Sequence, residues 1–323
     1  MKSGSTLEKV IASGKPAVTA ELGPPMSADP HEVVKKAQML KGFCDAANIT
    51  DCQTAVVRIS SIAAGAIAFQ QGLEPVIQMT CRDRNRIAIQ ADLLGAAALG
   101  LKNCLCLAGD HQKFSAAGKL KGHPGAKNVY DVDTCQLVGI LKKMRDEGKQ
   151  EGGDPLEVAP KFFVGASWTP MGDPIDFRPI NLLKKVNAGA DFIQTQGIYD
   201  MTLFREQMAK IRNMGLHERT AILAGIIVPK SAMMLKYMDS SVAGVSVPKE
   251  LIDRMNKAKA AAGEDKKKMR ELQEQEGVKI AIELIHQALE TPGVKGVHIQ
   301  AIEWENAIEG IVKAAGLYPR PQV

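Results

Sequence analysis

Short apolar runs alternate with helical patterns along the whole chain. A polar or Gly/Pro loop follows each apolar run, and a helix-like spacing of apolar residues follows the loop. We expect strands at 17–22, 45–51, 75–81, 104–110, 162–167, 192–196, 221–229 and 296–302. We expect helices at 33–42, 57–72, 85–100, 135–148, 180–190, 203–215, within 249–290 and at 307–316.

Strict alternation of strands and helices requires parallel strands joined by right-handed crossovers. Eight such units favour an α/β fold of the closed (β/α)8 TIM-barrel type over an open doubly wound sheet. We therefore predict a single barrel domain over residues 1–323. Two segments exceed a plain barrel. The loop at 111–130 is long enough to be a functional lid or a disordered segment, and we expect a solvated helical insertion within 249–290.

Composition narrows the class of protein. No apolar run approaches the roughly 18 residues needed to cross a bilayer, and the N-terminus has no signal-peptide pattern, so we expect a cytoplasmic location and no membrane. The six cysteines form no CxxC pair and no Cys/His metal spacing, which indicates reduced thiols and no metal site. A net charge of +5 is spread along the chain and aromatic residues make up 4%, so nucleic-acid binding has little support.

Polar residues gather at the expected strand ends, where the active site of a barrel lies. In "AVTAELGPP" the first strand ends in Glu21, an acid among small and branched apolar residues. The other ends carry Thr50, Asp51, Gln78, Thr80, Gly109, Asp110, Ser167, Trp168, Thr195, Gln196 and Gln300. Asp51 and Asp110 would equally suit helix caps or turns. That alternative fits Glu21 and Gln196 less well, because Gly-Pro-Pro follows Glu21 and Gln196 lies inside a strand.

Several reaction classes lack the residues that they need. No lysine stands at an expected strand end, since Lys102 precedes a strand and Lys184 and Lys185 lie on a helix, and this disfavours Schiff-base chemistry. The chain has no GxGxxG after a strand, no P-loop and no HExxH. The residue types alone indicate a barrel enzyme with an acid and a polar binding mouth.

Six segments resemble the methylenetetrahydrofolate reductase family in order and spacing. They are "AELGPP", "NITDC", "QMTCRD", "CLAGD", "NLLKKVNAGADFIQTQGIYD" and "GVKGVHIQAIEWE", and the resemblance runs from about residue 15 to the C-terminus. It implies a flavoprotein with FAD across the C-terminal mouth of the barrel. It also implies reduction of 5,10-methylenetetrahydrofolate to 5-methyltetrahydrofolate by hydride transfer from the reduced flavin.

The resemblance also implies roles for individual residues. Glu21 corresponds to the general acid, Asp110 to the acid that binds the pterin near the flavin, and Gln196 to an amide that contacts the folate. The implied cofactor-binding positions are Thr50, Gln78, Gly109, Asp110, Tyr130, Asp131, Trp168, Asn181, Lys184 and Lys185, and Met233 is an implied substrate contact. An enclosed acid with a raised pKa suits the reaction, because protonation of N10 opens the imidazolidine ring to an iminium, a good hydride acceptor.

Four positions depart from the family pattern. Ala108 replaces a usual arginine, and Gln78 stands where a histidine is common. Met233 lies near the position of a stacking aromatic, and Trp304 near that of an arginine for the folate tail. These changes leave folate and flavin chemistry in place. They leave open whether the flavin is FAD or FMN, and whether NADH reduces it directly.

The chain is similar to short, barrel-only forms from one-carbon and acetogenic pathways. In those forms an iron–sulfur/zinc partner subunit can supply electrons, so we expect NAD(P)H, ferredoxin or such a partner as the reductant, and an oligomer or a heteromeric complex. Two alternatives stay open. One is a pterin-binding barrel methyltransferase, which needs the pterin acid but no flavin; the other is a folate-binding or electron-transfer scaffold subunit. The sequence sets neither the direction of flux nor the oligomeric state.

Overall fold

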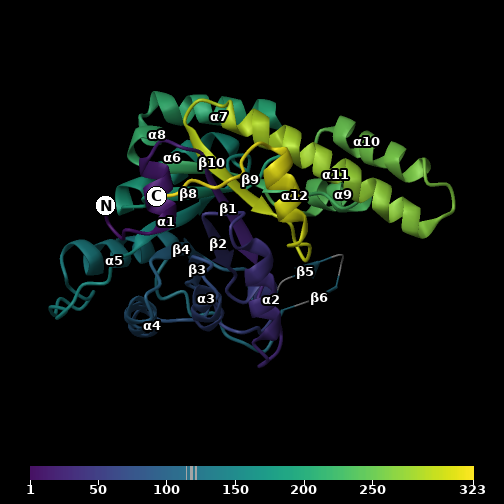
Figure 1. The fold of residues 1–323 in the computed structure, drawn as a ribbon. Helices are drawn as coiled ribbons and strands as arrows, with labels where there is room; N and C mark the ends of the chain where they lie inside the picture. Colours follow the sequence, from purple (N-terminus) through teal and green to yellow (C-terminus); the bar gives the residue numbers. More distant parts are fainter. Residues whose placement is uncertain (114, 117–118, 121) are drawn as a thin grey trace.

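Eight parallel strands close into a barrel at the centre of the molecule (Figure 1). This computed structural model describes residues 1–113, 115–116, 119–120 and 122–323. The order around the barrel is β1-β10-β9-β8-β7-β4-β3-β2. Barrel strands that follow one another in the chain therefore lie side by side, and the first closes on the last. The predicted single-domain (β/α)8 barrel is confirmed.

All eight strands expected from the apolar runs are present. They are Ala17–Leu22 (β1), Ala46–Ile49 (β2), Pro75–Thr80 (β3), Asn103–Leu107 (β4), Phe163–Trp168 (β7), Phe192–Gly197 (β8), Ala221–Ile227 (β9) and Val294–Gln300 (β10). The strands are almost wholly buried because helices cover them outside and side chains fill them inside. This is why they read as continuous apolar runs with few polar interruptions.

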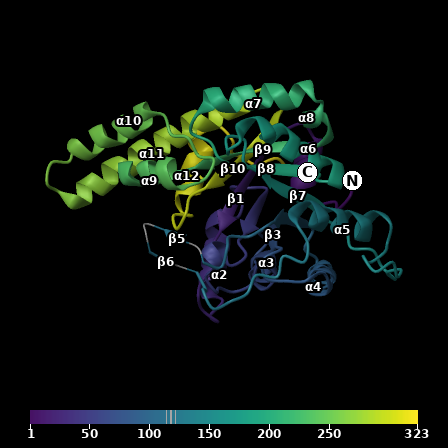
Figure 2. The ribbon, with the colours of Figure 1, turned by 180° about the vertical axis from the view of Figure 1, so that it is seen from behind.

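Helices surround the barrel on its outer face (Figures 1 and 2). They include His31–Leu40 (α2), Ser61–Gln70 (α3), Arg86–Ala98 (α4), Thr134–Asp146 (α5), Arg178–Ala188 (α6), Met201–Asn213 (α7), Leu216–Arg219 (α8), Ala232–Ser241 (α9) and Ala307–Ala314 (α12). The helix expected at 57–72 begins only at Ser61, because the Ser60 hydroxyl accepts from the Ala63 N–H at 3.3 Å and caps it. Sequence reasoning did not predict α9.

A short helix that the sequence pattern did not predict, α1 (Thr6–Ala12), closes the N-terminal end of the barrel. The Glu74 carboxylate accepts from the backbone N–H groups of Thr6 at 2.7 Å and Leu7 at 3.1 Å, which fixes the start of α1. Leu7 packs in a buried apolar cluster with Phe163 and Phe192, whose rings stack with centroids 5.1 Å apart. A binding site inside this barrel must therefore open at the C-terminal ends of the strands.

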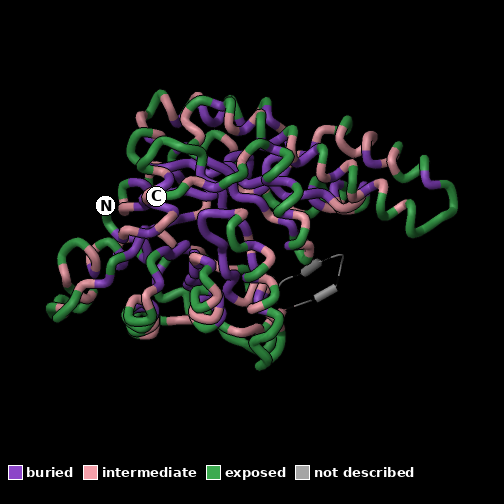
Figure 3. The backbone as a smooth tube through the Cα atoms, viewed as in Figure 1, coloured by how far each residue is buried: buried purple, intermediate pink, exposed green. Residues whose placement is uncertain are grey.

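The region between β9 and β10 carries two long helices, Lys249–Ala260 (α10) and Lys266–Leu289 (α11). They pack against each other and project from the barrel (Figures 1 and 2). Arg254 joins them through Glu276 at 2.8 Å and through both oxygens of Glu283 at 2.6 and 2.8 Å. Figure 3 shows the far end of this pair largely exposed, unlike the buried barrel.

The segment 111–130 lies after β4 and includes a small antiparallel pair, Ser115–Ala116 (β5) and Lys119–Leu120 (β6). Residues 114, 117, 118 and 121 lie outside the described residues, so the prediction of a lid here stays a prediction. Across the described chain, none of the helices combines the length and apolarity needed to span a membrane.

Candidate active site

A cavity of about 530 Å³ opens at the C-terminal ends of the strands. That volume lies within the range of about 300–1,000 Å³ typical of ligand sites. Its polar lining includes Glu21, Asn48, Asp51, Gln53, Gln78, Thr80, Arg82, Asp110, Ser167, Gln194, Gln196, His298 and Gln300. The structure therefore brings Glu21, Gln78, Gly109, Asp110 and Gln196, which the sequence singled out, to one cavity.

Glu21 supplies an acid poised near neutral pH. Burial is the largest cause that raises its pKa, and the nearby Glu305 carboxylate raises it further. The Gln300 amide and the Lys36 ammonium lower it, and the resulting pKa is about 7. The side chain is only partly accessible and lines the cavity. Such a carboxyl group holds its proton about half of the time at neutral pH.

The Gly-Pro-Pro segment after Glu21 is held by three hydrogen bonds. Lys36 Nζ donates to the Gly23 carbonyl at 3.2 Å, and Arg58 Nη1 donates to the Pro24 carbonyl at 3.0 Å. The Ile59 N–H donates to the Pro25 carbonyl at 3.1 Å. The chain leaves the strand in a fixed path, which limits the movement of the acid.

Asp110 lines the cavity and is exposed. Its Oδ2 accepts from the Thr54 N–H at 2.7 Å, and its carbonyl accepts from Arg82 Nη1 at 3.0 Å. Arg82 is itself fixed by Asp83, through contacts of 2.7 and 2.6 Å, and by the Cys52 carbonyl at 3.2 Å. Arg82 thus brings a guanidinium to this side of the cavity from the end of β3. Position 108, after β4, carries alanine in place of the arginine usual in the family pattern.

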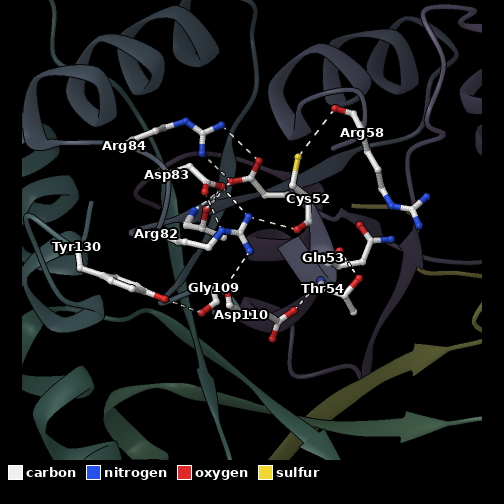
Figure 4. Close-up of polar contacts among 12 residues, drawn as sticks. Cys52, Gln53, Thr54, Arg58, Arg82, Asp83, Arg84, Gly109, Asp110 and Tyr130 are labelled. Carbon is white, nitrogen blue, oxygen red and sulfur yellow. Dashed lines mark hydrogen bonds and ion pairs between the residues drawn. The ribbon is translucent and has the colours of Figure 1, made fainter. Parts of the chain in front are cut away.

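The backbone beside Asp110 is strained. Cys52, Thr54 and Ala55 have φ values of 47°, 56° and 57°, in the left-handed region that L residues seldom adopt. In this conformation the Thr54 N–H points at the Asp110 carboxylate and donates a hydrogen bond to it (Figure 4). Strain of this kind costs about 1–3 kcal/mol per residue and tends to be kept where it positions functional groups.

Two predicted cofactor-binding residues lie at or just behind the cavity wall. Gln78 lines the cavity directly. Thr50 is buried and donates to Gln53 Oε1 at 2.8 Å, and Gln53 lines the cavity in its place. Thr50 would therefore act on a ligand through Gln53.

Tyr130 and Asp131 lie beyond the cavity. The Tyr130 hydroxyl donates to the Gly109 carbonyl at 3.3 Å (Figure 4). Asp131 pairs with Arg86 Nε at 2.9 Å and accepts from the Arg86 N–H, at the start of α4. The structure thus links Tyr130 to the cavity rim and places Asp131 at a helix start outside it.

The predicted positions on β7 and α6 face different surroundings. Trp168 is fully buried, does not line the cavity, and donates its indole N–H to the Arg178 carbonyl at 2.9 Å. Lys185 donates to the carbonyl of Ser167, which lines the cavity, and burial lowers the pKa of Lys185. Lys184 is exposed, with its ammonium 5.3 Å from the centre of the Phe177 ring, and Asn181 is half-buried one turn earlier.

Met233 lies away from the cavity. Its side chain is 78% exposed near the start of α9. Met238 and Val242, at the far end of the same helix, line the cavity instead. The structure therefore separates Met233 from the other predicted substrate contacts.

A polar layer inside the barrel was missed from the sequence. Asn48 and Gln194 exchange amide hydrogen bonds at 2.6 and 3.0 Å, and Gln194 Nε2 also donates to Thr19 Oγ1 at 3.1 Å. Thr19 Oγ1 lies 3.0 Å from His298 Nδ1. Asn48, Gln194 and His298 line the cavity, so this layer forms part of its wall. The available signal was a polar residue within each of four apolar strands, β1, β2, β8 and β10.

Burial lowers the pKa of His298 to about 3 from an ordinary value of 6.5. Between these values the unfolded chain binds a proton that the folded chain does not, so acid destabilises the fold by about 1.4 kcal/mol per pH unit. Between pH 6.5 and 5 the free energy of unfolding of wild type should therefore fall by about 2 kcal/mol because of His298. The His298→Gln variant has no imidazole at this position and should not show this loss. Urea unfolding at several pH values checks this, with exposed His123→Gln as the control. An unchanged pH slope in His298→Gln would contradict it.

The cavity lining suits the ring system of a flavin. Leu105, Leu107 and Ile227 provide apolar wall surface, while the amide and hydroxyl groups of the lining provide hydrogen bonds for a polar ring edge. Gly109 has φ of +89°, and a Cβ there would lie 3.0 Å from Arg82 Cβ and 3.1 Å from Thr80 Cβ. The backbone at Gly109 can therefore lie this close to Thr80 and Arg82, at the end of β3, only because glycine has no side chain.

The family profile and the curated relatives described here belong to one family. The sequence profile described as methylenetetrahydrofolate reductase matches residues 6–316. "Methylenetetrahydrofolate reductase 1" of Schizosaccharomyces pombe is 26% identical over 249 residues, which cover 76% of this chain and 36% of that protein. "Probable methylenetetrahydrofolate reductase (NADPH)" of Caenorhabditis elegans is 22% identical over 267 residues, 81% of this chain and 35% of that protein. The chain thus spans about a third of these relatives.

Solved structures share the fold. An uncharacterized protein from Clostridium thermocellum that binds two copies of 5-methyl-5,6,7,8-tetrahydrofolic acid superposes with a TM-score of 0.61 and 15% identity, covering 97% of this chain and all of that one. A long-chain alkane monooxygenase has a TM-score of 0.51 and 11% identity, covering 94% and 92% of the two chains. These likenesses describe the barrel alone, whereas the profile match covers nearly the whole sequence. The chain therefore belongs to the methylenetetrahydrofolate reductase family.

Proposed function

We propose that this chain reduces 5,10-methylenetetrahydrofolate to 5-methyltetrahydrofolate with a bound flavin. The observation that carries the proposal is Glu21, an acid with a pKa of about 7 in the cavity of a barrel from this family. Asp110 and Gln196 share that cavity. The C. thermocellum barrel binds 5-methyltetrahydrofolic acid, the product of the proposed reaction, which adds support for a folate ligand.

The cofactor in this proposal is FAD, with the shorter FMN as the alternative. Gly109 and Gln78 would lie against its ring, and Asn181 and Lys184, exposed or half-buried on α6, would hold its ribityl chain and phosphates. When bound, the reduced flavin supplies the hydride. NAD(P)H, ferredoxin or electrons from a partner subunit would reduce it again.

The proton chemistry falls to Glu21. Its carboxyl group gives a proton to N10, the bond from N10 to the methylene carbon breaks, and the electron pair stays on N10. The methylene group, still bonded to N5, is then an iminium. Its carbon accepts the hydride and becomes the methyl group. The Asp110 carboxylate favours the cationic charge that develops on the pterin, and the Gln196 amide orients the folate.

A methyl-transferring, pterin-binding barrel is the second candidate, and the methyltetrahydrofolate ligand of the C. thermocellum structure is the observation in its favour. A scaffold subunit that binds folate without reacting is the third. Neither needs a flavin, so a flavin assay separates both of them from the proposed reductase.

Purified protein mixed with FAD should bind it and show an oxidised flavin spectrum. Dithionite, used so that the physiological donor is not needed, should bleach the spectrum, and anaerobic 5,10-methylenetetrahydrofolate should restore it. Tetrahydrofolate without the methylene group is the control and should leave the flavin reduced. A protein that binds neither FAD nor FMN would refute the proposal.

A further inference from the structure

A partly buried ion pair lies behind Glu21. Lys36 Nζ, on α2, is 2.7 Å from Glu305 Oε1, in the segment between β10 and α12. The two side chains are 20% and 9% exposed. Neither residue lines the cavity. The pair therefore lies where it can influence Glu21 without contacting a molecule bound there.

The pair is tied to the strand end that carries the acid. Lys36 Nζ also donates to the carbonyl of Gly23, two residues after Glu21, at 3.2 Å. Gln300, at the end of β10 and five residues before Glu305, lines the same cavity as Glu21, and its amide lowers the pKa of that carboxyl group. Both partners are thus anchored close to the acid, and their charges act on it with opposite sign. Glu305 raises the pKa of Glu21 and Lys36 lowers it.

Among the other charged groups around the cavity, two form ion pairs with partners outside it. Across the cavity, Asp51 pairs with Arg84 at 2.7 Å and Arg82 pairs with Asp83 at 2.6 Å, while Asp110 is exposed at the rim. His298 stays neutral because burial lowers its pKa to about 3. On the remaining sides, Arg58 donates to the Pro24 carbonyl, and Lys230 donates to the Glu303 carbonyl and lies near Glu305.

We propose that Lys36 and Glu305 are positioning residues that together govern how readily Glu21 gives up its proton. Glu305 favours the protonated acid, and Lys36 limits that effect so that the proton can still be transferred. The inference deepens the proposed function, because it assigns this control to a charge pair outside the cavity. A purely structural tether between α2 and the segment after β10 would hold the two elements together without setting the proton equilibrium.

Infrared difference spectroscopy tests the proposal without flavin or folate. The signal of protonated Glu21 is the carboxylic C=O band that is present in wild type and absent from Glu21→Gln. Its titration midpoint should move to lower pH by about one unit in Glu305→Gln and to higher pH in Lys36→Met. In the double variant the midpoint should return toward wild type. Glu305→Asp and Lys36→Arg, which keep the charges, should stay close to wild type.

The same variants are then compared in the reoxidation of reduced flavin by 5,10-methylenetetrahydrofolate at each pH. The rate should fall with rising pH, and the midpoint of that fall should shift in the same directions as the infrared titration. Midpoints that stay fixed in Glu305→Gln and Lys36→Met, with rates lowered equally at every pH, would show a structural tether and overturn the inference. Infrared shifts in the expected directions without any Glu21-dependent reoxidation would instead refute only the proposed function.

Discussion

Replacing Glu21 by Gln should slow the reoxidation of reduced flavin by 5,10-methylenetetrahydrofolate by about 10²- to 10⁴-fold, the usual contribution of a general acid. Glutamine keeps the size and polarity of the side chain but has no proton to give to N10. The ring then opens slowly and the methylene carbon remains a poor hydride acceptor. Stopped-flow absorbance of the dithionite-reduced enzyme measures the rate.

Reduction of the flavin separates this role from damage to the site. Bleaching by dithionite should proceed in Glu21→Gln as in wild type, since that half-reaction does not involve N10. Glu157→Gln, at an exposed loop position, is the matched control and should leave both half-reactions unchanged. Equal losses in both half-reactions of Glu21→Gln would contradict the role of Glu21 as an acid.

The same substitution should make the protein more stable above neutral pH. The folded-state pKa of Glu21 is about 7 against an ordinary value of 4.5, so the folded chain holds a proton that the unfolded chain releases between these values. The free energy of unfolding therefore falls as pH rises from 4.5 to 7, by about 3 kcal/mol in total. Glutamine cannot ionise, so Glu21→Gln should exceed wild type by up to that amount at pH 8.

Urea unfolding at pH 8 and near pH 4.5 measures this difference. The advantage of Glu21→Gln should nearly disappear at the lower pH, where folded wild type holds the proton and the unfolded chain is about half protonated, and Glu157→Gln should show no such advantage. A variant that is less stable than wild type at pH 8 would mean that the ionised carboxylate is well accommodated. Its proton would then be held too weakly for the proposed chemistry.

The fold followed from the sequence because its signals are local. Each buried parallel strand is a short apolar run, and each helix carries its own spacing and caps, so eight repeats sufficed to predict the barrel. Helix α1 was missed because it has only seven residues and, besides its local cap Ser5, depends on a distant residue, Glu74, which accepts from its first N–H groups. Contacts of that kind leave no pattern along the chain.

The cavity was predictable to the extent that strand ends meet in any barrel. Glu21, Gln78, Asp110 and Gln196 could be assigned to one mouth from topology alone. Trp168 could not be placed correctly, because the side chains of a strand alternate between the interior and the helical layer, and its indole is buried against Arg178. The position of Met233 depended on the direction of α9, which periodicity did not detect.

The polar layer and the ion pair required three-dimensional information. Asn48 and Gln194 are 146 residues apart, yet their amides pair inside the barrel. Lys36 and Glu305 come from opposite ends of the chain and meet because β1 closes on β10. Sequence reasoning singled out Glu21, whereas the Lys36–Glu305 pair that we propose acts on it became visible only in the fold.

A single anaerobic turnover tests the central claim most directly. Dithionite-reduced, FAD-loaded protein, freed of excess reductant, is mixed with 5,10-methylenetetrahydrofolate, and flavin absorbance and 5-methyltetrahydrofolate are measured together. The account predicts one molecule of 5-methyltetrahydrofolate for each flavin oxidised, at a rate that falls as pH rises through about 7 in wild type and shows no such fall in Glu21→Gln. Flavin that stays reduced in excess folate, or that is oxidised without forming 5-methyltetrahydrofolate, would contradict it.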